Sequence, residues 1–285
     1  MKKIDKPSIT QEDICNSFKN LDYKDIIIQK SNEYDQNVYD VETFLNKENE
    51  LRKIDNKFKE YMNNTYSNRF SSSSKSYKDS YVFYRKLRSA VEVCPYCNYF
   101  TRTVRQLDHY LPKSIFPSFA ITANNLVPIC KDCNEDKDNY YSIKKEGMLL
   151  HPYYDNVAND ILQFLKCKVI EDFNIGFEFY IEMLEGWDED TYKRVKFHFE
   201  KFKLNKLYQA DFIADFTDFI GYIDEIKSVL PVLDKEMIEK LVQGKVDALK
   251  KQGNKPWSYA GFKSILENNW CMNTYIPQKF SVEQV

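Results

Sequence analysis

Apolar residues recur every three or four positions along most of the chain, which is the spacing that buries one face of a helix. Residues 10–62 follow this pattern from Ile14 and Phe18 onward, and Gly is absent from residues 1–90. Tyr77–Ala90 continues the pattern with a basic face. The same spacing predicts helices over four later stretches: Asp188–Phe202, Lys206–Val229, Asp234–Gln252 and Trp257–Asn269.

Three kinds of segment interrupt the helical pattern. Ser67–Ser76 contains four consecutive serines and predicts a flexible connector or an exposed loop. Residues 91–145 contain four prolines, which indicates a compact unit rich in loops. Ile161–Ile170 and Phe173–Leu184 predict two strands of a hairpin around Asn174-Ile-Gly176.

Together these elements predict an α+β fold that is mostly helical. We expect three regions in the chain of 285 residues. Residues 1–90 form an N-terminal helical region, residues 91–150 a compact central unit, and residues 151–285 a hairpin followed by helices. A chain of this length suits one elaborated domain or two modest ones.

The composition supports a globular protein. Hydrophobic residues make up 43% of the chain, and 21 Tyr and 20 Phe provide ample material for a core. Only 7 Gly are present, which argues against a Gly-rich phosphate-binding loop. No apolar run is long enough for a membrane span, and the N-terminus does not resemble a secretory signal. We therefore expect a cytoplasmic protein with no membrane partner.

The charge is unevenly distributed along the chain. The net charge of −2 disfavours a nucleic-acid-binding protein, but the distribution matters more than the sum. Residues 75–145 carry twelve Lys and Arg against seven Asp and Glu, a net charge of +5, whereas residues 146–285 carry −6. The positive charge gathers in the segment that also contains paired cysteines, which is where we expect any contact with nucleic acid.

Four of the seven cysteines form two Cys-x-x-Cys pairs, Cys94 with Cys97 and Cys130 with Cys133. Two intervening residues let both sulfurs turn onto one ion, at Zn–S distances of about 2.3 Å. Two such pairs in a chain without an export signal favour a closed structural Zn²⁺ site over a redox motif. Zinc binding would also explain how a loop-rich segment with little apolar material folds.

The residues between and after the two pairs carry a second pattern. They run as Leu107-Asp-His-Tyr-Leu-Pro-Lys113, then Asn125-Leu-Val-Pro-Ile-Cys130, then Cys133-Asn-Glu-Asp-Lys137. With the cysteine pairs, this order resembles the HNH endonucleases, over about fifty of the 285 residues. The resemblance implies a zinc-clamped ββα-metal unit that hydrolyses phosphodiester bonds with a divalent cation. The last motif position is Asn134, where many members of the family have His.

The resemblance implies a catalytic role for each motif residue. Asp108 would reach the metal ion and His109 the attacking water, at a strand end where a turn or bulge lets neighbours serve one site. His109 suits a general base because imidazole titrates near neutral pH. Asn134 would be the second metal ligand, and its amide oxygen favours Mg²⁺. Asn125, or Asn124 in its place, would hold the loop and orient the imidazole.

Four basic residues lie beside this pattern. Arg102, Arg105 and Lys113 flank it and suit contacts with a phosphate backbone, which provide affinity without sequence choice. Lys137 lies one helical turn beyond Asn134, on the same face, and we expect it to touch a phosphate as well. The expected partner is nucleic acid, with DNA as the first expectation.

The other two histidines have simpler interpretations. His151 precedes Pro152-Tyr-Tyr-Asp155 and is expected to be a structural loop histidine, with a place beside the active site as the alternative. His198 lies in an amphipathic helix and is expected to pack in the core.

Two other functions remain open. A zinc-knuckle module that binds nucleic acid or protein without chemistry needs only the four cysteines and the basic residues. An RNA-directed nuclease would use the same apparatus. The motif layout is also similar to HNH nucleases of bacterial restriction and anti-phage systems, such as Septu-like and retron-linked pairs, in which the nuclease works with an ATPase. That similarity implies a role in anti-phage defence and an ATPase or other regulatory protein as a partner.

Overall fold

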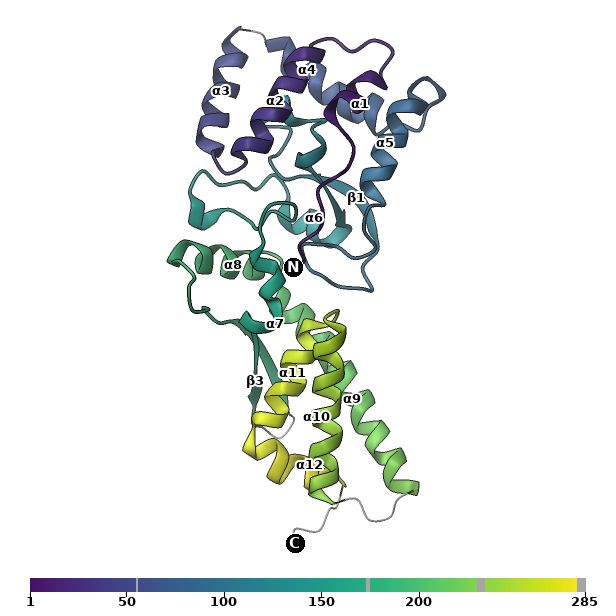
Figure 1. Cartoon of the computed structure of the whole chain (residues 1–285), viewed down its shortest axis with the longest axis vertical. Coiled ribbons are helices and arrows are strands. Elements are labelled where there is room, and N and C mark those ends of the chain that lie inside the picture. The colour runs from purple at the N-terminus through teal and green to yellow at the C-terminus, as the bar shows by residue number, and fades with distance from the viewer. Residues whose placement is uncertain (55, 173–174, 230–233, 281–285) are drawn as a thin grey trace. The chain divides into compact units, whose positions relative to one another are not determined.

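Helices predominate in the computed structural model, which describes residues 1–54, 56–172, 175–229 and 234–280 (Figure 1). Strands form two separate two-stranded sheets, so the predicted α+β, mostly helical class is confirmed. Among the described residues, no helix combines the length and the apolar character that a membrane span requires.

The chain divides into two compact units. The first contains Met1–Ala158 and Glu189–Phe202, and the second contains Asn159–Asp188 and Lys203–Val285. The three regions expected from the sequence stay a prediction, because the division into two compact units does not test whether each region folds independently.

The N-terminal part of the first unit is helical, as its apolar spacing predicts. Its elements are α1 (Gln11–Asn16), α2 (Lys24–Asn37), α3 (Val41–Ile54), α4 (Asn56–Asn64), the π-helix η1 (Thr65–Phe70), the 3-10 helix η2 (Lys75–Tyr77) and α5 (Lys78–Arg88). Thr10 begins α1 with a capping box, because its side chain accepts from the Asp13 N–H and the Asp13 carboxylate accepts from the Thr10 N–H.

The predicted connector over Ser67–Ser76 is wrong at its start. Residues up to Phe70 belong to η1, and the Phe70 side chain is fully buried. Burial of the Phe70 ring favours a packed helix here despite the polar neighbours, because removing an aromatic side chain from water stabilises the fold by about 2 kcal/mol or more.

The central part of the first unit has the order strand, strand, helix. Its elements are β1 (Val104–His109), the 3-10 helices η3 (Pro117–Phe119) and η4 (Ala123–Asn125), β2 (Leu126–Cys130), α6 (Lys131–Lys137), the 3-10 helix η5 (Lys145–Gly147) and, from later in the sequence, α8 (Glu189–Lys201). β1 and β2 are antiparallel, with Asp108 opposite Val127 and His109 opposite Leu126. The register shifts between Val104 and Gln106, so the bulge lies upstream of the Asp-His pair rather than at it.

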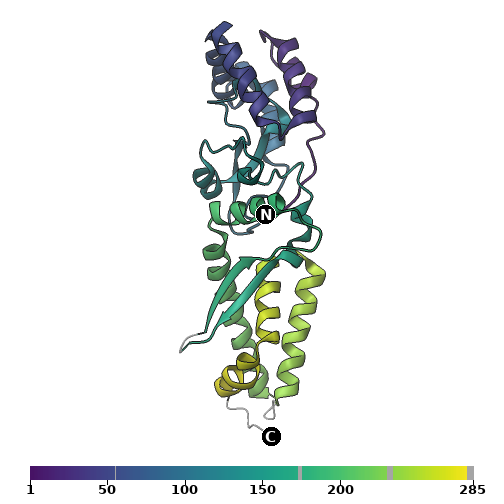
Figure 2. The same cartoon turned by 90° about the vertical axis from the view of Figure 1, so that its left-hand side faces the viewer.

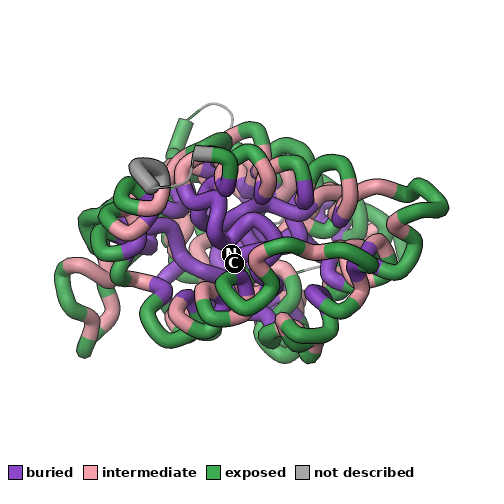
Figure 3. Tube along the Cα trace, turned by 90° about the horizontal axis from the view of Figure 1, so that it is seen from above, coloured by how far each residue is buried: buried purple, intermediate pink, exposed green. Residues whose placement is uncertain are grey.

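One hydrophobic core joins the N-terminal helices to this hairpin. Its buried members come from α1 and the loop after it, from α2, α4, η1 and α5, and from the β1–β2 segment: Ile14, Cys15, Phe18, Ile27, Phe58, Met62, Phe70, Leu87, Leu107, Ala120, Ile121, Ala123 and Leu126. α5 packs against both strands, and Figure 1 shows it alongside β1. Along the helices the trace alternates between buried and exposed turns (Figure 3), as amphipathic helices require.

The second unit pairs a hairpin with helices. Its elements follow the 3-10 helix η6 (Val157–Asp160) and are α7 (Ile161–Phe164), β3 (Leu165–Ile170), β4 (Gly176–Ile181), α9 (Leu204–Val229), α10 (Lys235–Gln252), α11 (Pro256–Glu267), the π-helix η7 (Cys271–Tyr275) and α12 (Ile276–Phe280). Figure 2 shows the two strands running alongside the helices of this unit. The four later helices predicted from the sequence are all present, within a few residues of their expected bounds.

The predicted hairpin is confirmed with one correction. β3 and β4 pair antiparallel from Leu165 opposite Ile181 to Ile170 opposite Gly176. Residues 173–174, the predicted start of the second strand and of the turn, lie outside the described residues. Ile161–Phe164 is a helix rather than the start of the first strand. Its four residues bury Ile161 and Phe164, a spacing of three that suits one helical turn as well as a strand.

Aromatic rings fill the space between the hairpin and the helices of the second unit. The Phe177 ring lies 4.6 Å from the Phe212 ring of α9 at an angle of 80°. Gly261 of α11 lies against the same ring, since an added Cβ would meet Phe212 atoms at 2.4 Å. Only Gly lets α11 approach α9 this closely without displacing the ring.

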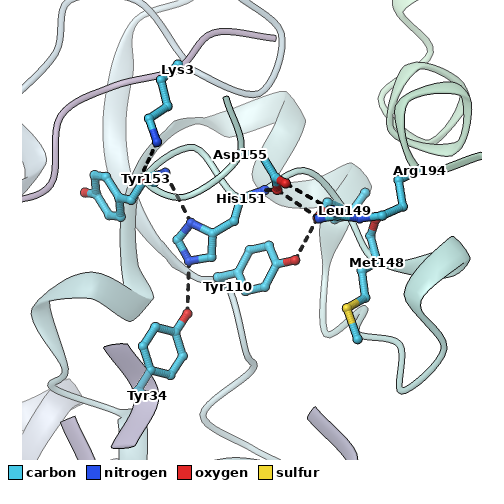
Figure 4. Close-up of polar contacts among 9 residues, drawn as sticks. All are labelled: Lys3, Tyr34, Tyr110, Met148, Leu149, His151, Tyr153, Asp155 and Arg194. Atoms are coloured by element: carbon cyan, nitrogen blue, oxygen red, sulfur yellow. Dashed lines mark hydrogen bonds and ion pairs between the residues drawn. The ribbon is translucent and has the colours of Figure 1, made fainter. Parts of the chain in front are cut away.

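His151 sits at the centre of a buried polar network in the first unit (Figure 4). Its Nδ1 accepts from the Tyr153 N–H at 3.2 Å, so its Nε2 carries the proton and donates to the Tyr34 hydroxyl at 3.0 Å. Asp155 accepts from the His151 N–H at 2.6 Å and pairs with Arg194 of α8 at 2.8 Å. Both ring nitrogens are therefore used structurally, in agreement with the first expectation for this residue.

Burial holds the pKa of His151 well below its usual range. In the unfolded chain this imidazole titrates at about pH 6.5. Below that pH the unfolded chain binds a proton that the folded protein does not bind, so protonation stabilises only the unfolded state. We expect His151 to lower the free energy of unfolding by about 1.4 kcal/mol as the pH falls from about 7.5 to about 5.5. Urea unfolding followed by circular dichroism measures this change. The free energy of unfolding should fall less over this pH range for His151→Gln than for the wild type.

Tryptophan fluorescence is unsuitable for that measurement, because Trp187, Trp257 and Trp270 all belong to the second unit. Equal losses of stability in the two proteins would contradict the assignment of His151 as a buried neutral imidazole.

Candidate active site and metal centre

Four cysteine sulfurs come together in the first unit. The Sγ atoms of Cys94, Cys97, Cys130 and Cys133 all lie within 4.8 Å of one another, and all four residues are buried. None of them forms a disulfide. A tetrahedral ion with bonds of about 2.3 Å needs sulfurs about 3.8 Å apart, so this donor set fits one Zn²⁺ ion.

Local backbone structure aims the four sulfurs at one point. After the first pair, Asn98 adopts a left-handed conformation with φ 54° and donates its N–H to the Cys94 carbonyl at 2.7 Å. Asn tolerates this conformation better than most residues. Cys130 ends β2 and Cys133 lies in the first turn of α6, so the second pair turns at the junction of a strand and a helix.

Burial raises the pKa of the Cys94 thiol well above its usual range. Without a cation, burial therefore favours the neutral thiol, and a bound divalent ion is what would favour thiolates at this position. The four cysteines that the sequence selected as zinc ligands are thus brought together in a geometry that suits this role.

A cleft of about 300 Å³ opens beside the hairpin. Its lining includes the predicted catalytic residues Asp108, His109 and Asn134, together with Lys113. The remaining lining residues are Tyr66, Leu107, Pro112, Ser114, Asp138 and Asn139. Asp108 and His109 are the last two residues of β1, and both line the cleft.

The His109 imidazole has a defined orientation. Its Nε2 lies 2.9 Å from the Ala120 carbonyl oxygen. A carbonyl can only accept, so Nε2 carries the proton and the lone pair is on Nδ1. Burial, with smaller contributions from Lys113 and Lys137, lowers the pKa of His109 to about 3. The imidazole is therefore neutral at physiological pH.

Asp108 and Lys137 form a buried ion pair. Lys137 is fully buried, and its Nζ donates to Asp108 Oδ1 at 3.0 Å and to the His109 carbonyl at 2.8 Å. The other oxygen of Asp108 accepts from the Tyr96 hydroxyl at 3.0 Å. The predicted contact between Lys137 and a phosphate is therefore wrong, because the ammonium is enclosed and holds the Asp-His backbone and side chain instead.

Asn125, and not Asn124, holds the loop that follows His109. It is fully buried, its Oδ1 accepts from the Leu111 N–H at 2.8 Å, and its Nδ2 donates to the Leu111 and Phe119 carbonyls at 3.0 and 3.1 Å. Asn124 instead donates to Asp35 at the surface. Asn125 acts on the imidazole indirectly, because it fixes the loop that brings the Ala120 carbonyl to Nε2.

The other basic candidates differ in their surroundings. Arg102 pairs with Asp132 at 2.8 Å, so its guanidinium already has an anionic partner. Arg105 is exposed on β1, and Lys113 lines the cleft with its Nζ 5.8 Å from the centre of the Tyr66 ring. For Arg105 and Lys113, contact with a phosphate stays a prediction.

Sequence reasoning missed two tyrosines at this site. Tyr96 lies inside the first cysteine pair and binds Asp108, and Tyr66 belongs to the N-terminal helices and contacts the His109 ring. No signal in the sequence distinguished them from the other tyrosines of an aromatic-rich chain.

Two known proteins resemble part of the chain. Over 126 residues it is 28% identical to protein ea31 of Escherichia phage lambda, which covers 44% of this chain and 42% of that protein. Over 62 residues it is 37% identical to Septu protein PtuB of Bacillus thuringiensis, which covers 22% of this chain and 23% of that protein. The chain thus spans less than half of the length of either relative. No protein-family model and no solved structure matches it.

Metal analysis tests the cysteine cluster. We expect one Zn²⁺ per purified chain, and its removal to cost on the order of 10 kcal/mol and to unfold the first unit, as seen by loss of helical circular dichroism. Cys133→Ser should lose the metal. Cys167→Ser, which lies outside the cluster, should keep it and serves as the control. A full equivalent of zinc in the Cys133→Ser protein would contradict the assignment.

The buried ion pair predicts a large and localised effect on stability. Lys137→Met leaves the Asp108 carboxylate without its cation, and removing one partner of a buried pair costs about 3–5 kcal/mol. Lys131→Met, in the same helix, breaks only an exposed pair with Glu135 and should cost less than about 1 kcal/mol. Urea unfolding of both variants measures the difference, and equal stabilities would rule out a role for the buried pair.

Proposed function

We propose that this chain is a divalent-cation-dependent endonuclease of the HNH type that hydrolyses phosphodiester bonds, and that its substrate is DNA. The observation that carries the proposal is the shared cleft of Asp108, His109 and Asn134, beside a hairpin and helix that also hold the four-cysteine cluster. A general base and two oxygen donors in one polar cleft are what metal-assisted hydrolysis needs.

His109 is the general base in this proposal. Its protonated Nε2 is held by the Ala120 carbonyl, which leaves Nδ1 to take the proton from the attacking water. The depressed pKa keeps the imidazole unprotonated before substrate binds. An anionic phosphate in the cleft favours the imidazolium form, so the pKa of His109 rises as the water loses its proton.

Asp108 and Asn134 would hold the catalytic cation. Their donors are hard oxygens, and Asp138 adds a second carboxylate to the cleft, which suits Mg²⁺. Each oxygen of Asp108 already accepts one hydrogen bond and retains capacity for a further contact. When bound, the cation would neutralise charge on the phosphate and stabilise the departing 3′ oxygen.

Lys113 and Arg105 would contact phosphates on either side of the scissile bond. Such contacts contribute affinity without sequence preference, and they weaken with salt. Lys137 would act within the protein, since its buried ammonium orients the Asp108 carboxylate and the His109 backbone.

The biological setting proposed for the nuclease is anti-phage defence. The partial similarity to Septu protein PtuB supports this setting, in which the nuclease would work with an ATPase or other regulatory protein. The partial similarity to a protein of phage lambda supports a mobile element as the alternative setting.

Cleavage assays test the proposed chemistry. We expect the purified protein, alone or with its partner, to cleave DNA with Mg²⁺ and to stop when Mg²⁺ is omitted. Omission is preferable to a chelator, which would also remove structural zinc. His109→Ala should lower the rate by about 10²- to 10⁴-fold. The control is His151→Gln, assayed where it is folded, because that histidine lies outside the cleft.

Each alternative function has its own outcome in the same assay. Cleavage of a matched RNA but not of DNA would favour an RNA-directed nuclease. Binding of nucleic acid without cleavage would favour a zinc-knuckle module. Undiminished cleavage by His109→Ala would refute the mechanism.

A further inference from the structure

Tyr66 reaches the cleft from outside the segment that carries the HNH-like motif. It is the second residue of η1, the π-helix that continues α4. The Ser71 N–H donates to the Tyr66 carbonyl at 3.0 Å, the five-residue spacing of a π-helix. A π-turn inserts an extra residue and redirects the side chains around it, and such turns recur at functional sites.

The Tyr66 ring packs directly on the His109 ring. Their centroids are 4.3 Å apart and their planes meet at 67°, an edge-to-face arrangement that aromatic pairs favour. On other sides the Tyr66 ring contacts Tyr84 of α5, 6.5 Å away, and the buried Phe70, 6.2 Å away. The ring that meets the imidazole is thus itself held by the core.

A second contact is needed to orient the imidazole fully. The hydrogen bond from Nε2 to the Ala120 carbonyl fixes one ring atom, but it still allows the ring plane to tilt about that bond. An aromatic ring packed against His109 restricts this tilt. Burial also raises the pKa of the Tyr66 phenol, so the hydroxyl stays neutral and does not compete with His109 as a base.

We propose that Tyr66 is a positioning residue of the active site, whose ring holds the plane of the His109 imidazole so that Nδ1 is directed into the cleft. The inference rests on the proposed nuclease function. It makes the N-terminal helical region part of the catalytic machinery, since residues 91–150 alone would lack the ring that orients the base.

Steady-state kinetics on DNA with Mg²⁺ test the proposal. Tyr66→Leu and Tyr66→Met should lower kcat by roughly 10- to 100-fold and leave KM within about 3-fold, because a misdirected base slows chemistry without weakening binding. Tyr66→Phe should restore kcat, because it keeps the ring. Phe58→Leu is the matched control, since it removes a buried ring of the same core, from α4, whose ring partner is Tyr23. It should keep kcat despite a loss of stability.

Nitrogen-15 NMR of the histidine rings reads the orientation without any cleavage. In the wild type and in Tyr66→Phe, the His109 signal, assigned by its loss in His109→Ala, should report one tautomer with the proton on Nε2. In Tyr66→Leu the same tautomer should persist, because the Ala120 carbonyl still accepts from Nε2, but the signals of the ring should broaden as the imidazole tilts about that bond. Contacts between Tyr66 and His109 ring protons should also appear in wild-type nuclear Overhauser spectra.

The outcomes separate this inference from the proposed function. A folded Tyr66→Leu protein with wild-type kcat overturns the inference while the nuclease function stands. An equal loss of kcat in Tyr66→Phe overturns it too, because the hydroxyl and not the ring would then be required. If the wild type cleaves nothing, the proposed function fails, and the inference fails with it. If neither truncated variant folds, the wild-type spectra decide, since absent ring-to-ring contacts overturn the inference.

Discussion

The approach of four cysteine sulfurs to within 4.8 Å of one another is the constraint on which the central part of the first unit depends. One pair precedes β1, and the other spans the junction of β2 and α6. A cation at this point would tie the open end of the hairpin to the start of the helix. The segment is broken by prolines, and its buried apolar residues join a core shared with the N-terminal helices, so metal-ligand bonds would add a local constraint at the end of the hairpin.

The buried polar contacts at the other end of the hairpin have a complementary role. Lys137 binds the Asp108 carboxylate and the His109 carbonyl, Tyr96 binds the second oxygen of Asp108, and Asn125 ties together the loop that follows. A buried charge or amide with unmet hydrogen bonds costs several kcal/mol, so these partners leave little freedom to the residues they hold. The result is a cleft whose polar side chains are oriented before any ligand arrives, which is the preorganisation that catalysis by electrostatic stabilisation requires.

The helices that surround the motif-bearing segment are more than a scaffold. α2 supplies Tyr34 to His151, α8 supplies Arg194 to Asp155, and η1 brings Tyr66 to His109. Each contact reaches across a large distance in sequence, so the conformation of residues 104–155 depends on elements that precede and follow them. The N-terminal helices therefore help to fix the conformation of the motif-bearing segment.

The sequence by itself determined whatever depends on local spacing. The apolar periodicity located the helices, the two Cys-x-x-Cys pairs located the cysteine cluster, and the motif order selected Asp108, His109 and Asn134, which line one cleft. These features follow from backbone geometry, which repeats every few residues. Only the tertiary structure decided which polar side chains are enclosed and by what. Lys137, one turn beyond Asn134, was expected to touch a phosphate, and Tyr66 was one of 21 tyrosines, beside a serine-rich stretch. Whether a polar side chain is enclosed, and by which groups, is settled by packing between segments far apart in the sequence, which local spacing does not record.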